Sequence, residues 1–270
     1  HIEQGHVFDL EIHVYYEQEH ASVRIVDTHT NIVQIEKNWQ VIFEDKTTSL
    51  ELKADHSALI MKQIWDFSQT VDIDDVKEIL DRQITCNMAI ANEGIHNSYG
   101  ANIGHVILNM DSDCVKTRAK AYAAAGSDAR MNGCELPVVI NSGSGNQGIT
   151  CCVPVVVYAK ELDCTQEQLY RALVLSNLTA IYIKTGIGTL SAFCGAVSAG
   201  AAAGAGIAYL HNGTYKEIQH TIVNALAILS GTICDGAKAS CAAKIASSVD
   251  AGIMGYYMYK NKQQFYAGDG

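Results

Sequence analysis

The chain has 270 residues, of which 48% are hydrophobic, and its formal net charge is -10 at pH 7. This length and apolar content allow a sizeable core in one or two domains. The acidic balance argues against nucleic acid or an anionic membrane as a partner. The 9 cysteines are odd in number and include no CxxC pair, so they indicate reduced thiols in the cytoplasm rather than a disulfide framework or a zinc ribbon.

The first 45 or so residues favour β-strands. The stretches FDLEIHVYY, ASVRIVD, TNIVQIE and QVIFED alternate or cluster β-branched and aromatic side chains. They predict a small antiparallel sheet within a β-rich segment over residues 1–47.

From about Ser57 onward the apolar spacing becomes helical, and Ser57 is a candidate N-cap. The acidic stretch Asp72–Asp75 should open the next helix, which is expected to run to Ala91. Thr165 and Gln168 have the spacing of a capping box. Further helices are predicted over Asp113–Ala125, Thr150–Lys160, Thr165–Ile183, Leu190–Leu210, Tyr215–Leu229 and Ala237–Tyr259. Strands followed by helices indicate an α+β fold with a segregated all-α domain over residues 57–270.

The uncharged run from Thr185 to Tyr215 is long enough for a membrane span. It is rich in Gly, Ala and Ser and poor in Leu, Ile and Phe. This composition, with the pair Gly200 and Gly204, favours helices packed closely in a protein core over a membrane span.

A glycine-rich stretch, NSGSGNQG, follows an apolar run and precedes a predicted helix. Its backbone N–H groups at a helix N-terminus would suit a carboxylate, although a plain helix connector remains the alternative. It has neither the P-loop pattern nor the spacing GxGxxG.

The candidate substrate-binding residues here are Asn141, Ser142, Gly143, Ser144, Gly145, Asn146, Gln147 and Gly148. We expect Asn146 and Gln147 to face the pocket. Asp128 and Arg130 are interpreted as a charged pair that either orients substrate or only holds this loop.

The stretch CDGAKASC places Cys234 and Cys241 seven positions apart, which is about 10 Å along a straight helix. The Asp235-Gly236 break would end one helix and let another start at Ala237, so that the two thiols approach each other.

Cys194 lies in the small-residue stretch GTLSAFCGAVSAG. Cys194, Cys234 and Cys241 are therefore either unrelated core residues or ligands of a multi-iron cluster. Lys238 is a further candidate substrate-binding residue, which either neutralises cluster or substrate charge or is simply solvated. We expect Cys194, Cys234 and Cys241 to converge. The vicinal pair Cys151-Cys152 is interpreted as helix packing, and four cysteines are expected to stay apart: Cys86, Cys114, Cys134 and Cys164.

The stretches NSGSGNQGIT, GTLSAFCGAVSAG and CDGAKASCAAKIASSVDAG together resemble the L-cysteine desulfidase branch of proteins related to the α chain of iron–sulfur L-serine dehydratase. The resemblance covers nearly the whole chain, including HTNIVQIE and SDARM. It implies that Cys194, Cys234 and Cys241 hold a [4Fe-4S] cluster with one iron open to substrate as a Lewis acid. The implied reaction is α,β-elimination of L-cysteine, giving pyruvate, ammonia and sulfide.

The family also has an N-terminal TGCTEP-type segment, with a cysteine proposed as an acid/base group, and a GMGVG-type loop. Neither occurs in this sequence, and family members continue past the final GDG. We therefore expect a piece of a longer protein and assign no catalytic base. The alternatives are an L-serine ammonia-lyase on the same cluster, a redox or sensor protein, and a non-catalytic helical domain with structural thiols. The expected partner is a small amino acid, and homo-oligomerisation is left open.

Overall fold

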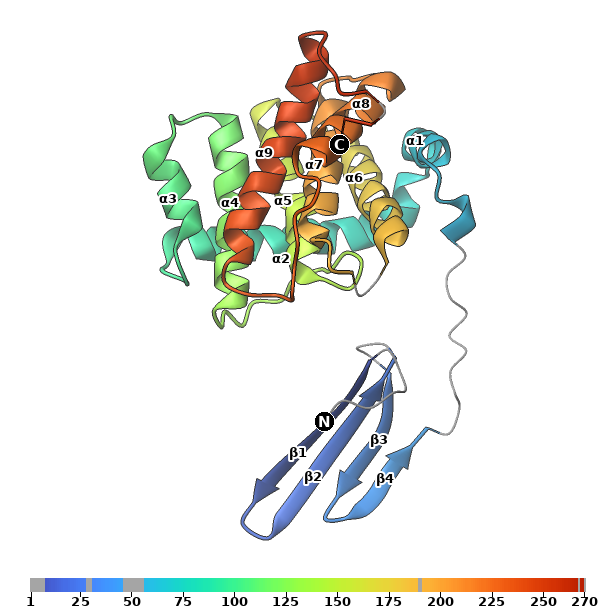
Figure 1. Cartoon of the computed structure of the whole chain (residues 1–270), viewed down its shortest axis with the longest axis vertical. Coiled ribbons are helices and arrows are strands. Elements are labelled where there is room, and N and C mark those ends of the chain that lie inside the picture. Colours follow the sequence, from blue (N-terminus) through green and yellow to red (C-terminus); the bar gives the residue numbers. More distant parts are fainter. Residues whose placement is uncertain (1–7, 28–30, 46–55, 189–190, 267, 270) are drawn as a thin grey trace. The chain divides into compact units, whose positions relative to one another are not determined.

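The computed structural model describes residues 8–27, 31–45, 56–188, 191–266 and 268–269. Strands come first and helices follow, so the predicted α+β class with a helical C-terminal part is confirmed (Figure 1). The chain divides into two compact units, His1–Asp55 and His56–Gly270. Parts of the predictions that fall on residues 1–7, 28–30, 46–47, 189–190, 267 and 270 lie outside the described residues.

The described part of the first unit is a four-stranded antiparallel meander. Its strands, in spatial as in chain order, are β1 (Asp9–Tyr16), β2 (Glu19–Val26), β3 (Ile32–Lys37) and β4 (Gln40–Glu44). Asn38 and Trp39 connect the last two strands with φ values of 49° and 65°, the left-handed conformations that a type I′ turn requires. The Trp39 ring stacks on His20 with 4.0 Å between ring centroids, and this contact supports an unusual residue for such a turn.

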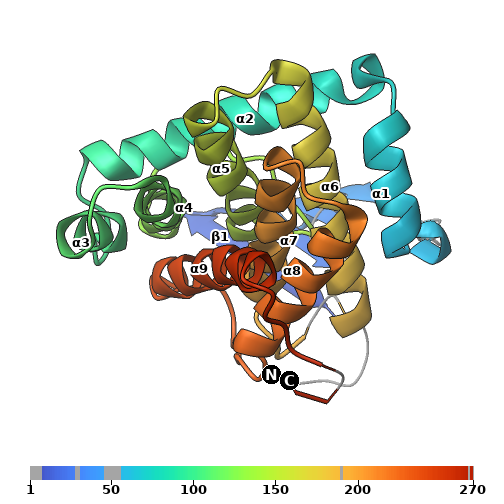
Figure 2. The ribbon, with the colours of Figure 1, turned by 90° about the horizontal axis from the view of Figure 1, so that it is seen from above.

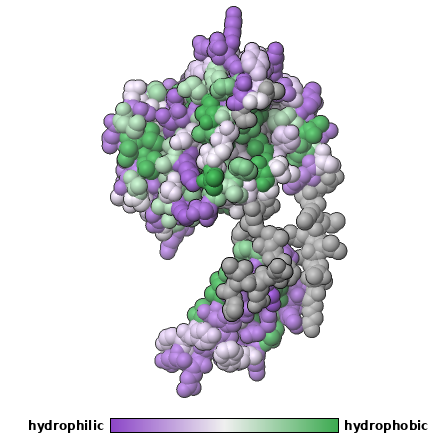
Figure 3. Space-filling view, viewed as in Figure 1, coloured by the Kyte–Doolittle hydropathy of each residue, from purple (hydrophilic) through white to green (hydrophobic). Residues whose placement is uncertain are grey.

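The second unit is helical. The helices described in it are α1 (Met61–Thr70), α2 (Ile73–His96), α3 (Ile103–Met110), α4 (Val115–Met131), α5 (Gly145–Glu161), α6 (Gln166–Ile187), α7 (Gly195–Leu210), α8 (Tyr215–Ile228) and α9 (Cys241–Lys260). Helix α7 packs against α5, α6, α8 and α9, and Figure 2 shows it among them. The surface of this unit mixes hydrophobic and hydrophilic residues on the face seen in Figure 3. Among the described helices, none has the length and hydrophobicity needed to cross a membrane.

Several helix ends follow the capping signals of the sequence. The Asp72 side chain accepts the backbone N–H of Asp74 at 3.1 Å at the start of α2. Thr165 forms the predicted capping box with Gln168 at the start of α6. The prediction for Ser57 is wrong, because only a short 3-10 turn forms there and α1 begins after Ile60.

Two differences from the predicted helices arise from contacts across the fold. Helix α3, which the sequence did not predict, has the Asp128 carboxylate at its start, accepting the Ile103 N–H at 2.6 Å. Helix α4 continues past its predicted end at Ala125. Gly126 does not end the helix. A Cβ atom there would approach Ile149 of α5 to 3.2 Å, so the glycine serves close packing between helices.

Glycines let α7 and α9 cross in backbone contact, as the small-residue run predicted. A Cβ atom on Gly200 would lie 2.4 Å from the backbone carbonyl of Ser248, and one on Gly252 would lie 2.3 Å from the Gly200 oxygen. Gly204 is equally restricted, at 2.6 Å from the Gly252 oxygen. Because the opposing atoms are backbone, neither helix can accommodate a side chain without moving.

Substituting Gly200 with Ala should therefore lower the free energy of unfolding by about 2 kcal/mol or more, the cost of overpacking a tight contact. Urea denaturation followed by circular dichroism measures this loss. Gly186→Ala in α6 is the matched control, because a Cβ atom there would meet nothing within 4 Å and alanine is the better helix former. Equal stability of both variants would contradict the close crossing.

Candidate functional site

The glycine loop (Asn141–Gly148) is a tight turn that leads directly into α5. Asn141 and Ser144 exchange backbone hydrogen bonds of 3.1 and 3.0 Å, and the Ser144 hydroxyl caps the helix by accepting the Gln147 N–H at 3.4 Å. Helix α5 therefore begins directly after Ser144 and not at Thr150 as predicted. The cap and the tight packing of the loop glycines outweigh the low helix propensity of glycine.

Amide side chains from α2 and α6 hold the start of this loop. Asn177 donates to Gln83 Oε1 at 2.8 Å and accepts from Gln83 Nε2 at 2.9 Å. The same Asn177 oxygen accepts from Asn141 Nδ2 at 3.0 Å. The Asn87 side chain accepts the Val139 N–H at 2.9 Å and donates to the Val139 carbonyl at 3.2 Å. This network fixes the backbone that enters the loop, and the sequence analysis missed it.

Arg130, at the end of α4, lies against the first turn of α5. Its Nη1 donates to Asn146 Oδ1 at 3.3 Å, and Ser127 Oγ donates to the same oxygen at 3.3 Å. A Cβ atom on Gly145 would lie 2.3 Å from Arg130 Nε, so the glycine makes room for the guanidinium. A cation beside a helix N-terminus is an arrangement that favours an anionic group such as a carboxylate.

The predicted charged pair of Asp128 and Arg130 does not form among the described residues. Asp128 instead turns toward α3, and its second oxygen, Oδ1, is buried with no hydrogen-bond partner in the part of the chain that the structure describes. Burial raises the pKa of this carboxyl group, while the N–H groups of Ile103 and Gly104 act in the opposite direction. Asp128 thus positions α3, and of the two predicted partners Arg130 is the one that contacts the glycine loop.

Gln147 joins the glycine loop to the start of α7. Its side chain is only 6% exposed, and a Cβ atom on Gly195 would lie 2.6 Å from both its amide carbon and Nε2. The Gln147 Oε1 atom is buried and has no hydrogen-bond partner among the described residues. Gly195 follows Cys194 directly, so the predicted substrate loop and the first predicted cluster ligand are neighbours.

A backbone bridge brings Cys194 and Cys234 together. The Cys194 N–H donates to Thr232 at 3.1 Å, and the Cys234 N–H donates to Ala192 at 2.7 Å. Cys194 is the N-cap of α7, so this helix begins later than the predicted start at Leu190. The reason is that the residues just before Cys194 pair with the loop between α8 and α9. Burial raises the pKa of the Cys194 thiol, and the neighbouring Cys234 thiol acts in the same direction.

Cys241 is the first residue of α9, seven positions beyond Cys234, and it ends the segment of residues 229–241, here called the cysteine loop. The expectation that Cys234 ends one helix and that Ala237 starts the next is wrong, because α8 stops at Ile228 and the intervening segment is loop. Gly236 has a φ of 120°, which turns this loop, and the Lys238 N–H donates to Cys241 Sγ at 3.3 Å. The convergence of all three thiols on one cluster stays a prediction.

The lysines near the thiols differ in their surroundings. Lys238, predicted at the substrate, pairs with Asp235 at 2.5 Å and has a side chain that is 56% exposed. Lys244 Nζ donates to the Ile233 carbonyl at 3.1 Å. Lys184, which the sequence analysis did not single out, is only 8% exposed.

Most of the other cysteines lie apart in the fold. Cys151 and Cys152 are fully buried in α5, where Cys151 Sγ lies 3.3 Å from Asn177 Oδ1. Burial raises the pKa of both thiols. The remaining four are placed in α2, at the N-cap of α4, and after the ends of α4 and α5: Cys86, Cys114, Cys134 and Cys164.

The described side chains include no group of three His, Cys, Asp or Glu residues placed to hold one metal ion. A four-iron cluster has a different requirement, because each thiolate binds its own iron. A buried thiol, a second thiol bridged to it by backbone hydrogen bonds, and a third in the same loop fit that donor set.

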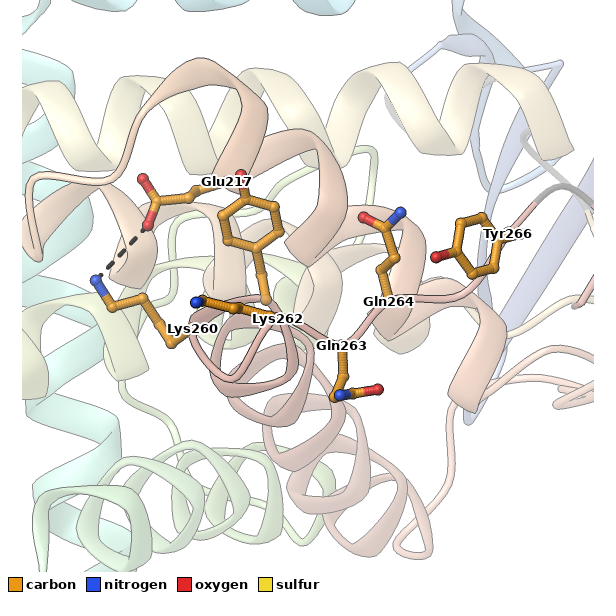
Figure 4. A pocket seen from close by; sticks show the side chains of 7 residues that line it. Glu217, Lys260, Lys262, Gln263, Gln264 and Tyr266 are labelled. Carbon is orange, nitrogen blue, oxygen red and sulfur yellow. Dashed lines mark ion pairs between the residues drawn. The ribbon is translucent and has the colours of Figure 1, made fainter.

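A separate cavity of about 480 Å³ lies at the other end of α9 (Figure 4). Its lining includes the ion pair between Lys260 and Glu217, whose atoms are 3.7 Å apart. Glu217 already caps α8 through Thr214. Since α9 spans about 28 Å between Cys241 and Lys260, this cavity is not part of the thiol site.

Comparison with known proteins places the whole chain in one family. The family model described as serine dehydratase alpha chain matches residues 11–268. A UPF0597 protein of Desulfitobacterium hafniense is 57% identical over 98% of this chain and 62% of its own length. UPF0597 proteins of Lachnoclostridium phytofermentans and Finegoldia magna are 54% and 51% identical, over 92% and 97% of this chain and 60% and 63% of theirs.

No solved structure matches the chain. The chain spans about three fifths of the length of these relatives. The match of the family model over almost every residue, the glycine loop and the cysteine loop included, shows that the chain belongs to the serine dehydratase alpha chain family.

Proposed function

We propose that the chain is the cluster-binding part of an iron–sulfur lyase that eliminates sulfide from L-cysteine. The observation that carries this proposal is the contact of Gln147 with Gly195, which joins an anion-binding helix start to a thiol site. The nine free cysteines suit a reducing, cytoplasmic setting. Because the chain spans only part of its relatives, the activity, substrate and partners of the whole protein are part of the proposal.

Cys194, Cys234 and Cys241 would hold a [4Fe-4S] cluster. When bound, that cluster would supply a Lewis acid for the leaving thiol of the substrate. The N–H groups of the α5 first turn and the Arg130 guanidinium would bind the substrate carboxylate. The Gln147 Oε1 atom, an acceptor with no partner among the described residues, would orient the substrate ammonium group.

The reaction removes the α proton and breaks the Cβ–S bond, so that aminoacrylate and hydrosulfide form. Aminoacrylate then tautomerises to the imine and reacts with water to give pyruvate and ammonia. The described residues provide no assigned base for the α proton. The expected place of this part in the reaction is therefore substrate binding and activation of the leaving group.

Serine is the second candidate substrate, and the name of the matching family model favours it. Elimination from serine would release water in place of sulfide and give the same pyruvate. An anaerobic assay with each amino acid separates the two, because only cysteine yields both pyruvate and sulfide. Turnover of serine alone would replace the proposed substrate, and turnover of neither by cluster-loaded full-length protein would refute the lyase.

Replacing Cys234 with Ser should reduce bound iron from about four per chain to near zero after anaerobic reconstitution, because a cluster with three thiolates depends on each of them. Iron analysis and visible absorption measure the loss. Cys164→Ser, in the turn after α5, is the control and should keep its iron. A Cys234→Ser chain that retains a full cluster would show that the thiols are only structural.

Arg130→Gln should weaken L-cysteine binding by the reconstituted chain about 10- to 100-fold, the loss expected for one charge-assisted hydrogen bond. Calorimetric titration measures binding without requiring turnover. Arg82→Gln on the exposed face of α2 is the control, since Arg82 pairs only with Glu78 among the described residues. Arg130→Lys, which keeps the charge, should recover part of the affinity, and unchanged affinity in Arg130→Gln would exclude the carboxylate role.

A further inference from the structure

One face of α6 carries a small residue at every fourth position and then a lysine. The series is Ala172, Ser176, Ala180 and Lys184, all buried, whereas the residue after Lys184 is exposed. Residues four apart lie above one another on a helix, so these side chains form a single stripe. A lysine is out of place there, because the other positions are filled by side chains that permit close packing.

The partners of the stripe on α7 run in the opposite direction. A Cβ atom on Gly206 would lie 3.1 Å from the Ala172 oxygen and 3.3 Å from Ser176 Cβ. One turn further, Ala180 shares a buried cluster with Ala199 and Ala202. One turn beyond Ala180 on α6 lies Lys184. Because α7 runs in the opposite direction, the turn of α7 that precedes Ala199 is the first turn of that helix. The Lys184 side chain is therefore level with the helix start that Cys194 caps.

A buried lysine normally has a carboxylate as its partner, but the acidic groups near Lys184 are thiols. No described Asp or Glu forms an ion pair with it. Burial lowers the pKa of its ammonium group, and the thiols of Cys194 and Cys234 act in the opposite direction. A buried ammonium is costly unless an anion accompanies it. Among the described residues, the acidic groups that act on the charge of Lys184 are those two thiols.

We propose that Lys184 is a positioning residue of the thiol site, whose ammonium group compensates the negative charge of the Cys194 and Cys234 thiolates when they hold the cluster. This inference rests on the proposed function. It adds a residue of α6 to a site that is otherwise formed by the glycine loop and the cysteine loop. Charge beside metal-bound thiolates tunes how firmly a cluster is held.

The other lysines of this region do not fit that role. Lys238 is exposed and already paired with Asp235. Lys244 Nζ donates to the backbone carbonyl of Ile233. Lys184 differs from both because it is buried and its position on the stripe is fixed by packing.

Lys184→Met, which keeps the length of the side chain without its charge, should have opposite effects in two measurements. In the iron-free, reduced chain, the urea midpoint should equal or exceed that of the wild type, because a buried charge is removed. In the reconstituted chain, the half-time of iron release to a chelator should shorten about tenfold. Lys184→Arg, which keeps the charge, should release iron within about twofold of the wild-type rate.

The exposed Lys77→Met on α2 is the control and should change neither measurement. A lower urea midpoint for Lys184→Met would show that the lysine only supports the fold, and an unchanged rate of iron release would also overturn the proposal. The urea measurement needs no iron. If the wild-type chain takes up no iron, the proposed function fails. The urea midpoints still decide whether Lys184 serves only the stability of the fold.

Discussion

The close approach of α7 to its neighbours is the constraint on which the candidate site depends. Gly200 and Gly252 bring the backbones of α7 and α9 into contact, and Gly206 brings α7 against Ala172 of α6. Side chains of ordinary size would hold these helices farther apart. Because a helix is stiff, fixing its middle also fixes its ends. The starts of α5, α7 and α9 and the end of α6 are positioned in this way.

The site that results is built from helix ends and loops rather than from one deep pocket of charged side chains. The chain carries a net charge of -10, yet Arg130 contacts the glycine loop, Lys244 contacts the cysteine loop, and Lys184 is level with the start of α7. Together with the N-termini of α5 and α7, they provide a local environment that favours anions. An amino-acid carboxylate and an anionic thiolate cluster are the two anions that the proposal places there.

Much of the fold could be predicted because its signals are local. The caps at Asp72 and Thr165 and the change from strand to helix periodicity depend on neighbouring residues only. The backbone bridge between Cys194 and Cys234 could not, because it joins distant parts of the chain. The Asp235-Gly236 break, the small-residue stretch around Cys194 and the family resemblance led us to expect the thiols to converge, but none of them predicted these hydrogen bonds. Lys184 had a signal, a lysine at the end of an i,i+4 series of small residues, but recognising it required knowing which face of the helix is buried.

The central claim is that the glycine loop and the cysteine loop form one cluster-dependent site. Anaerobic crystals of the iron-reconstituted chain, measured at the iron absorption edge, test it most directly through anomalous scattering. We expect one compact group of about four irons bound by Cys194, Cys234 and Cys241 beside Gln147. Iron bound elsewhere, for example at Cys151 and Cys152, or a thiol site that contains none after reconstitution, would contradict the account.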